Sequence, residues 1–358
     1  MKYSREELIR PAVQALSAYR TPQAGDLIKL STMENPYHWP EPLVQAWLEK
    51  LRAVHINRYP EADAPALKDA LRTYYGIDAD TPMLLGNGSD ELIQLLLLAL
   101  GSASRTVLAP SPTFVMYQHS TTAVGGEFVR VPLAAGDFRL SHNLMLAAVE
   151  QHQPAVIFIS YPNNPTGNLF ERRVIDDVIE AANGLVVVDE AYAPFADSTY
   201  LDDIGKHSNL LVMRTLSKVG LAGLRLGILF GAPQWLNEFE KLRLPYNINT
   251  LSQVSAQFAL ENREIFDAQT RQICADRQLL LDGLSALDGV QPFPTAANFV
   301  MFRTRKAQGS RIYRDLQMHG VLVKDLHGSD PLLEDCLRVS VGTPAENEVF
   351  LSALSKVI

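Results

Sequence analysis

The chain has 358 residues, which is too long for one small core and predicts two domains. Its formal net charge of −8 argues against nucleic acid or an anionic membrane surface as a partner. Two cysteines, Cys274 and Cys336, do not suggest a disulfide framework, so a reducing cytoplasm is expected. The polar start lacks the apolar core of a signal peptide, and the longest apolar run, residues 95–100, is too short to cross a bilayer.

The N-terminal part of the chain reads mainly as helix. Residues 1–30 are expected to form an arm, and the pattern predicts helices over residues 65–76 and 92–100. Ser89 is the expected N-cap of the second helix, and Gly101 is its expected stop.

Short apolar runs then alternate with helical patterns. Continuous apolar strands separated by helices are typical of a parallel sheet covered on both faces, so residues 31–248 are expected to form a large, mostly parallel αβα domain. A long helical pattern leads out of it, and residues 249–358 are expected to form a small α+β domain. The predicted strands are 106–109, 155–159, 185–188, 210–213, 226–230, 297–302, 320–324 and 336–341.

Polar side chains follow two of these strands. Asp189 ends one strand, and Lys218 lies just past the end of another. In open parallel sheets ligands bind beyond the carboxyl ends of the strands, so we expect these two groups to converge. A lysine and an aspartate in this arrangement suit pyridoxal phosphate (PLP). Lys218 would form a Schiff base with the aldehyde, and Asp189 would pair with the protonated pyridine nitrogen.

Three further side chains fit the ring of the same cofactor. Tyr192, which we group with Lys218 and Asp189 as catalytic, and Asn164 would hydrogen-bond to the ring hydroxyl. Phe114 would stack on the ring. The Asn-Asn-Pro-Thr-Gly segment that holds Asn164 follows a buried strand, which is more specific than an isolated Asn-Pro turn.

A phosphate-binding cup is predicted where a glycine-rich turn opens a helix. Small residues let backbone N–H groups approach a phosphate, and the helix N-terminus favours an anion. Arginine binds phosphate through two hydrogen bonds, which suits Arg225. The predicted cup consists of Gly88, Ser89, Asp90, Thr215, Ser217 and Arg225.

Arg338 stands inside an otherwise apolar strand. A buried arginine needs an anionic partner, which is either a substrate anion or a structural carboxylate. No metal-ligand spacing is found, so no metal site is expected.

Together these motifs resemble the fold-type I PLP-dependent transferases, and more closely the histidinol-phosphate aminotransferase family of histidine biosynthesis. The resemblance runs nearly end to end. It rests on residues 34–37, 57–60, 86–91, 162–167, 189–192 and 337–343.

The resemblance implies a cytoplasmic homodimer in which Tyr59 of one subunit reaches the cofactor phosphate of the other. It also implies that Arg338, Tyr19 and Lys324 meet the substrate phosphate, with Asn164 also contacting the substrate, and that Arg338 accepts glutamate in turn. Two features depart from the family pattern. The loop from Lys218 to Arg225 is one residue shorter than usual, and Lys324 replaces an arginine.

The implied reaction is a ping-pong transamination between histidinol phosphate and 2-oxoglutarate. Two alternatives use the same scaffold: an aminotransferase for aromatic amino acids and a threonine-phosphate decarboxylase. A PLP-binding regulator without turnover is a further class, but such proteins usually carry an added DNA-binding module. A non-PLP α/β protein would have to assemble all these motifs by chance.

Overall fold

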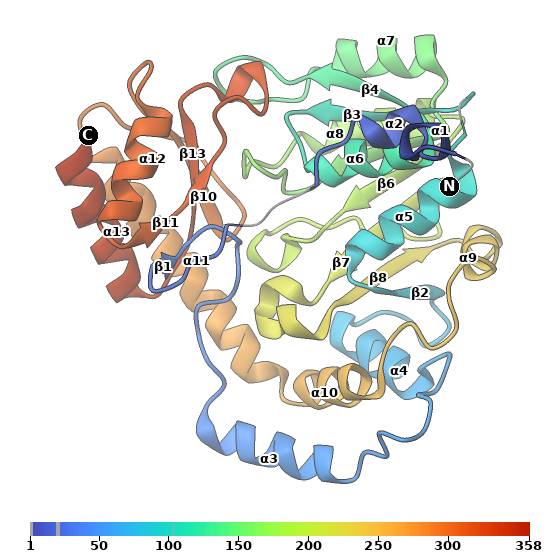
Figure 1. Cartoon of the computed structure of the whole chain (residues 1–358). Helices are drawn as coiled ribbons and strands as arrows, with labels where there is room; N and C mark the ends of the chain where they lie inside the picture. Colours follow the sequence, from blue (N-terminus) through green and yellow to red (C-terminus); the bar gives the residue numbers. More distant parts are fainter. Residues whose placement is uncertain (1–2, 19–21, 103) are drawn as a thin grey trace.

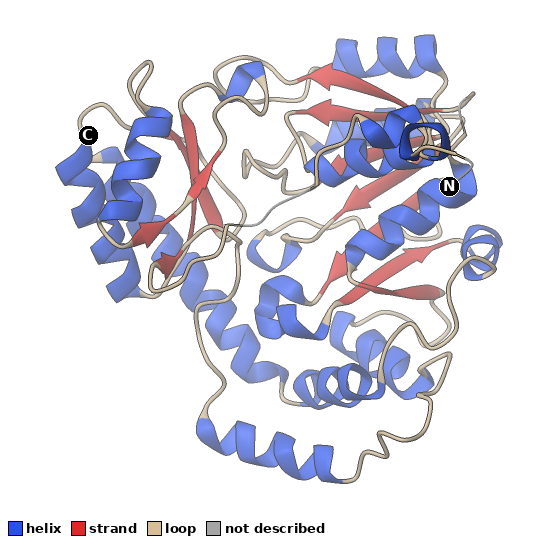
Figure 2. Cartoon of the chain, viewed as in Figure 1, coloured by secondary structure: helices blue, strands red, loops and turns tan. Residues whose placement is uncertain are grey.

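The computed structural model of the protein describes residues 3–18, 22–102 and 104–358. In this part of the chain, a large domain is built around a seven-stranded mixed sheet and a small domain around a four-stranded antiparallel sheet (Figures 1 and 2). The predicted fold class, a mostly parallel αβα domain with a smaller α+β domain, is confirmed.

The large sheet has the strand order β2-β8-β7-β6-β5-β3-β4. Its neighbours from β4 to β7 are parallel, whereas β8 is antiparallel to both β7 and β2. The sequence pattern predicted a mostly parallel sheet and did not specify which strand would be antiparallel. However, residues 216–225 between β7 and β8 are too few for the helical crossover that a parallel neighbour needs. The strands are β2 (Met83–Asn87), β3 (Thr106–Ser111), β4 (Glu127–Pro132), β5 (Val156–Ser160), β6 (Leu185–Asp189), β7 (Leu210–Thr215) and β8 (Leu226–Gly231).

Helices cover both faces of this sheet (Figure 1). One face shares an apolar core with α5 (Ser89–Leu100), α6 (Val115–Val124) and α9 (Pro233–Glu240). The other face shares a core with α3 (Glu41–Arg52), α4 (Pro65–Tyr75), α7 (His142–His152), α8 (Arg172–Ala181) and α10 (Thr250–Glu261). The strands β5, β6 and β8 are therefore buried along their whole length.

The small domain has the strand order β12-β13-β10-β9 and a core of its own. Thr343 and Glu346 form a capping box that begins its last helix. Its elements are β9 (Gln291–Pro292), β10 (Phe299–Arg303), β11 (Val321–Leu322), β12 (Lys324–Asp325), β13 (Cys336–Ser340), α11 (Arg263–Ser285), α12 (Gly309–Met318) and α13 (Pro344–Val357).

The N-terminal segment connects the two domains. It begins with two short helices, α1 (Arg5–Leu8) and α2 (Pro11–Gln14), and β1 (Ile28–Lys29) pairs in parallel with β11 of the small domain. At the other junction, α11 places Phe266 in the core of the large domain and Ile273 in that of the small domain.

The predicted boundary at residues 248 and 249 remains a proposal. Helix α10 packs against α3 and α4 and adds Phe258 to the large-domain core, which favours a boundary within α11. Among the described residues, no helix is both long and apolar enough to cross a membrane.

Candidate active site

Two adjoining cavities lie at the carboxyl ends of β5, β6 and β7. The inner cavity has a volume of about 230 Å³ and brings together most of the predicted cofactor residues. Those that line it are Ser89, Asp90, Phe114, Asn164, Asp189, Tyr192, Thr215, Ser217, Lys218 and Arg225. They come from six separate segments, which meet because parallel strands present their carboxyl ends at one edge of the sheet.

Asp189 is the last residue of β6 and is buried. Its carboxylate accepts hydrogen bonds from the Tyr117 hydroxyl at 2.5 Å and from the Ala191 backbone N–H at 3.1 Å. Burial raises the pKa of Asp189 to about 6, although the Tyr117 hydrogen bond opposes the shift. Among the described residues no cation forms an ion pair with this carboxylate, so the site has room for a cationic ligand group.

Lys218 follows β7 in a short turn of helix, residues Ser217–Leu221. Its Nζ donates to the Thr32 carbonyl at 3.4 Å and lies 5.6 Å from the centroid of the Tyr192 ring. Burial, and next the positive charge of Arg338, lower the pKa of Lys218 to about 8. About a tenth of this amine is therefore uncharged at pH 7, far more than for an ordinary lysine, and the uncharged form is the one that acts as a nucleophile or general base.

Asn164 connects Tyr192 to Arg338. Its Nδ2 donates to the Tyr192 hydroxyl at 3.0 Å, and its Oδ1 accepts from Nη1 of Arg338 at 2.5 Å. Tyr192 and Arg338 both pack against the ring of Phe299. The large-domain loop after β5 and the small-domain strand β13 thus meet through one buried amide.

The predicted phosphate cup lies at the start of α5. Gly88, with φ +84°, is the N-cap residue, and Ser89 is the first helical residue rather than the N-cap that the sequence pattern indicated. A Cβ on Gly88 would lie 2.4 Å from Nη2 of Arg225, so only glycine lets this guanidinium approach the turn. A Cβ on Gly227 would likewise lie 2.6 Å from the backbone N of Ser89.

The remaining groups of the cup come from β7 and its following loop. The Thr215 and Ser217 hydroxyls are 2.9 Å apart. Arg225 has left-handed backbone geometry, with φ +52°, and its guanidinium lies 3.3 Å from the Asp90 carboxylate. Although the loop from Lys218 to Arg225 is one residue shorter than is usual in the family, Arg225 lines the inner cavity.

The outer cavity has a volume of about 260 Å³ and lies between the domains. It shares Met33, Phe114 and Asn164 with the inner cavity and is also lined by Arg338 and Lys324. Burial, and next the charge of Arg338, lower the pKa of Lys324. The two cations stand opposite each other on β12 and β13, which gives this cavity a positive wall.

Tyr59, a predicted cofactor residue, lines neither cavity of this chain. The Tyr59 side chain is 82% exposed and stacks on Tyr246 with ring centroids 4.6 Å apart. Tyr19 lies outside the described residues.

Other lining groups were not predicted as site residues. Thr32, Met33 and Glu34 enter the inner cavity from the segment after β1. Tyr117 was also missed as the partner of Asp189. Its place in the first turn of α6, three residues after the predicted Phe114, was the available signal.

Known proteins resemble this chain over nearly its full length. It matches the aminotransferase class I and II family over residues 25–354. It is 53% identical to histidinol-phosphate aminotransferase 2 of Nitrosococcus oceani, over 97% of this chain and 96% of the other. It is 46% identical to the histidinol-phosphate aminotransferase of Chromobacterium violaceum, over 99% of both chains.

A solved structure shares the fold. The histidinol-phosphate aminotransferase from Sinorhizobium meliloti, in complex with pyridoxal-5'-phosphate, has a TM-score of 0.88 at 24% identity, covering 99% of this chain and 98% of that one. The family resemblance that the sequence motifs indicated is confirmed by these likenesses. The chain belongs to the aminotransferase class I and II family.

Proposed function

We propose that this enzyme is a PLP-dependent aminotransferase that interconverts histidinol phosphate and imidazole-acetol phosphate, with glutamate and 2-oxoglutarate as the second pair. One observation carries the choice of substrate: full-length relatives at 53% and 46% identity are named histidinol-phosphate aminotransferases. The geometry of the two cavities supports the chemistry.

The inner cavity fits the cofactor. Asp189 is a buried carboxylate whose pKa is raised to about 6, so a protonated pyridine nitrogen would supply the countercharge that it lacks. Lys218 presents an amine with a pKa of about 8 to the same space. Hydroxyls, the N-terminus of α5 and Arg225 gather on one side, which suits a phosphate.

Bound PLP would supply an aldehyde that condenses with amines and an electron-poor ring that accepts the electrons of a broken Cα–H bond. Asp189 would hold the ring nitrogen protonated. Tyr192 and Asn164 would hydrogen-bond to the ring hydroxyl, and Phe114 would pack against the ring. Gly88, Ser89, Asp90, Thr215, Ser217 and Arg225 would form the phosphate site.

Lys218 is the proposed general base and acid. Its Nζ would take the proton from the substrate Cα and deliver it to C4′ of the cofactor. Because its pKa is about 8, the free amine is populated at neutral pH and its conjugate acid is still acidic enough to donate.

The outer cavity is the proposed site of the substrate phosphate. Arg338 and Lys324 form its positive wall, and Tyr19 remains a predicted partner. Lysine offers a point charge instead of a planar fork, so Lys324 would hold the phosphate less rigidly than arginine would. Asn164 lines both cavities and hydrogen-bonds to Arg338, which lines the outer one, and the two residues would contact either amino donor in turn.

A homodimer is part of the proposal. Tyr59 is 82% exposed and stacks on Tyr246. Ile56, three residues before Tyr59, is 80% exposed, and Leu244, two residues before Tyr246, is 70% exposed. Exposed apolar residues in this concentration favour an interface. Tyr59 would reach the cofactor phosphate of the partner subunit.

We also place the enzyme in the cytoplasm. Cys274 on α11 and Cys336 on β13 are both free thiols. A reducing compartment keeps such thiols free.

The test is a half-reaction titration of the PLP-loaded protein. Its visible spectrum is followed with histidinol phosphate, phenylalanine and threonine phosphate in parallel, and released carbon dioxide is measured. Amino transfer from low concentrations of histidinol phosphate, with a much weaker response to phenylalanine, supports the proposal.

Two other results would replace the proposed substrate or reaction with another. A preference for phenylalanine would assign the protein to the aromatic aminotransferases, and carbon dioxide from threonine phosphate would make it a decarboxylase. A protein that binds no PLP would refute the cofactor assignment as well.

A further inference from the structure

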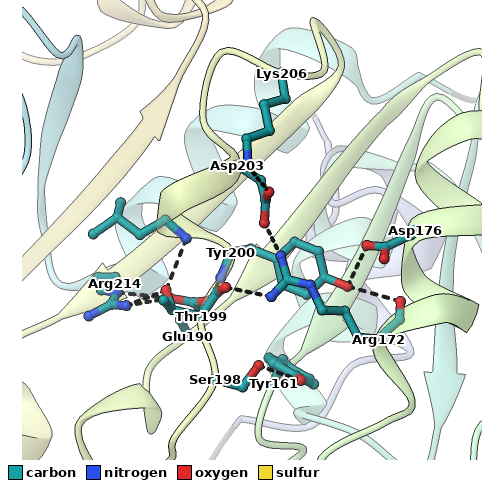
Figure 3. Close-up of polar contacts among 11 residues, drawn as sticks. Tyr161, Arg172, Asp176, Glu190, Ser198, Thr199, Tyr200, Asp203, Lys206 and Arg214 are labelled. Atoms are coloured by element: carbon teal, nitrogen blue, oxygen red, sulfur yellow. Dashed lines mark hydrogen bonds and ion pairs between the residues drawn. The ribbon is translucent and has the colours of Figure 1, made fainter.

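A buried ion pair lies directly behind the two proposed catalytic residues. Glu190 follows Asp189, and Arg214 lies on β7, four residues before Lys218. The two charged groups are 2.6 Å apart, and their side chains are 0% and 11% exposed. Figure 3 shows Glu190 and Arg214 with their polar neighbours. Side chains alternate along a strand, so Asp189 shares the α5/α6 face of the sheet with Val187, whereas Glu190 and Arg214 lie on the opposite face.

The hydrogen-bonding groups of this ion pair are well satisfied. Oε2 of Glu190 accepts from Nε of Arg214 at 2.9 Å and from the Thr199 hydroxyl at 2.8 Å, while Oε1 accepts from the backbone N–H of Tyr200. Nη2 of Arg214 also donates to the Thr199 hydroxyl at 2.7 Å, and the guanidinium lies over the ring of Tyr75. Both side chains therefore have a single well-defined arrangement.

The same residues join the two strand ends. The backbone N–H of Glu190 donates to the carbonyl of Met213 at 2.8 Å, which continues the β6–β7 ladder by one residue. The ion pair is a second link between the same strands, made by the side chains of Glu190 and of Arg214, the residue after Met213. The carboxyl end of β6, which carries Asp189, is thereby fixed against the segment that leads into Lys218.

The ion pair also determines the net charge next to Asp189. Glu190 has a charge close to Asp189 and raises its pKa, and Arg214 offsets that charge. Removing one partner of a buried pair leaves an uncompensated charge, whereas replacing both partners removes the imbalance.

We propose that Glu190 and Arg214 are positioning residues, whose buried ion pair holds Asp189 and Lys218 in register and keeps the charge behind them neutral. This inference rests on the proposed function, because Asp189 and Lys218 are assigned their roles there.

The experiment compares Arg214→Met, Glu190→Gln and the double variant with the unaltered protein. Asp203→Asn is the matched control. Asp203 is 15% exposed and pairs with Arg172 and Lys206 in the same network (Figure 3), but it lies in the short helix Leu201–Asp203, outside the strands that carry Asp189 and Arg214. Three quantities are measured: the protonation midpoint of Lys218 in cofactor-free protein, from the pH dependence of its acetylation by mass spectrometry; the PLP dissociation constant; and kcat and KM.

We expect opposite shifts. Arg214→Met leaves a negative charge and moves the Lys218 midpoint up by about half a pH unit or more, and Glu190→Gln leaves a positive charge and moves it down. Each single variant lowers kcat by about 10- to 100-fold, and the double variant returns towards the unaltered midpoint. Asp203→Asn loses thermal stability but keeps the midpoint and kcat.

Shifts in the same direction in both single variants, or a loss of stability with midpoint and kcat unchanged, would overturn the inference. If Arg214→Met does not fold, Glu190→Gln and the double variant decide the question. Failure of the proposed function has a different signature, since the unaltered protein would then bind no PLP or would act on another substrate, while the Lys218 midpoints remained measurable.

Discussion

At the ends of β6 and β7, each face of the sheet carries one acidic and one basic side chain. The two charges form an ion pair on one face and do not on the other. One face carries a buried Asp189 and a partly buried Lys218, and neither forms an ion pair with any residue that the structure describes. The other face carries a buried Glu190 and a partly buried Arg214, which are paired at 2.6 Å. Two consecutive residues, Asp189 and Glu190, thus point to different environments.

The difference shows how a binding face is distinguished from a structural one. Burial raises the pKa of Asp189 to about 6 and lowers that of Lys218 to about 8, so each charge is disfavoured where it stands. The pair on the other face is neutral as a unit, and both carboxylate oxygens of Glu190 accept hydrogen bonds. A charge that the protein leaves uncompensated is available to a ligand, whereas a compensated charge contributes to the scaffold.

The largest expected effect on activity comes from removing the amine of Lys218, on the unpaired face. Lys218→Ala should lower the rate of transamination by about 10⁴-fold or more, because the nucleophile and the general base are lost together. Steady-state assays with histidinol phosphate measure the loss. Lys206→Ala is the control, since Lys206 is 62% exposed and pairs with Asp203 outside the cavities. Turnover retained by Lys218→Ala would remove Lys218 from the mechanism.

The same chemical change on the two faces should alter stability in opposite directions. Lys218→Met should stabilise cofactor-free protein by up to about 3 kcal/mol at pH 7, because a pKa lowered from 10.5 to about 8 opposes folding. Arg214→Met should destabilise it by about 3–5 kcal/mol, because Glu190 is left buried and unpaired. Urea unfolding of both variants measures the two effects.

The pH dependence gives a second test of this prediction. The unfolded lysine binds more protons than the folded one between about pH 8 and 10.5, so the unaltered protein gains stability across this range. The advantage of Lys218→Met is therefore complete below about pH 8 and disappears as the pH rises. An advantage that did not change with pH would assign the effect to packing.

Much of the site could be predicted because the chemistry coincides with strand ends. Asp189, Asn164 and Lys218 each follow a run of buried apolar residues, and the parallel sheet brings such positions together. The placement of Arg225 was also predicted, although its left-handed backbone and its approach to Gly88 appear only in three dimensions.

What could not be predicted depends on packing between distant segments. Tyr117 reaches Asp189 because its ring stacks on Phe158 of β5, the neighbour of β6, and one hydrophobic pattern does not specify which strand a helix covers. Glu190 and Arg214 are ordinary charged residues in the sequence, and only their common face reveals the ion pair. Tyr59 contacts no cavity in a single chain, so its proposed role depends on a second subunit.

The smallest expected effect is a shift in the pH dependence of PLP binding. It is tested by substituting two buried tyrosines, one near each face of the sheet. The Tyr117 hydroxyl lowers the pKa of Asp189, so Tyr117→Phe should raise that pKa further above 6. PLP binding that needs ionised Asp189 weakens as the pH falls through this pKa, and the midpoint of that loss should move up by about one unit in Tyr117→Phe. Tyr200 bonds to Asp176 on the opposite face, so Tyr200→Phe should lose about 1 kcal/mol of stability without moving the midpoint. Equal midpoints in both variants would mean that Tyr117 only fills space, and the contrast between the faces would then rest on the charged residues alone.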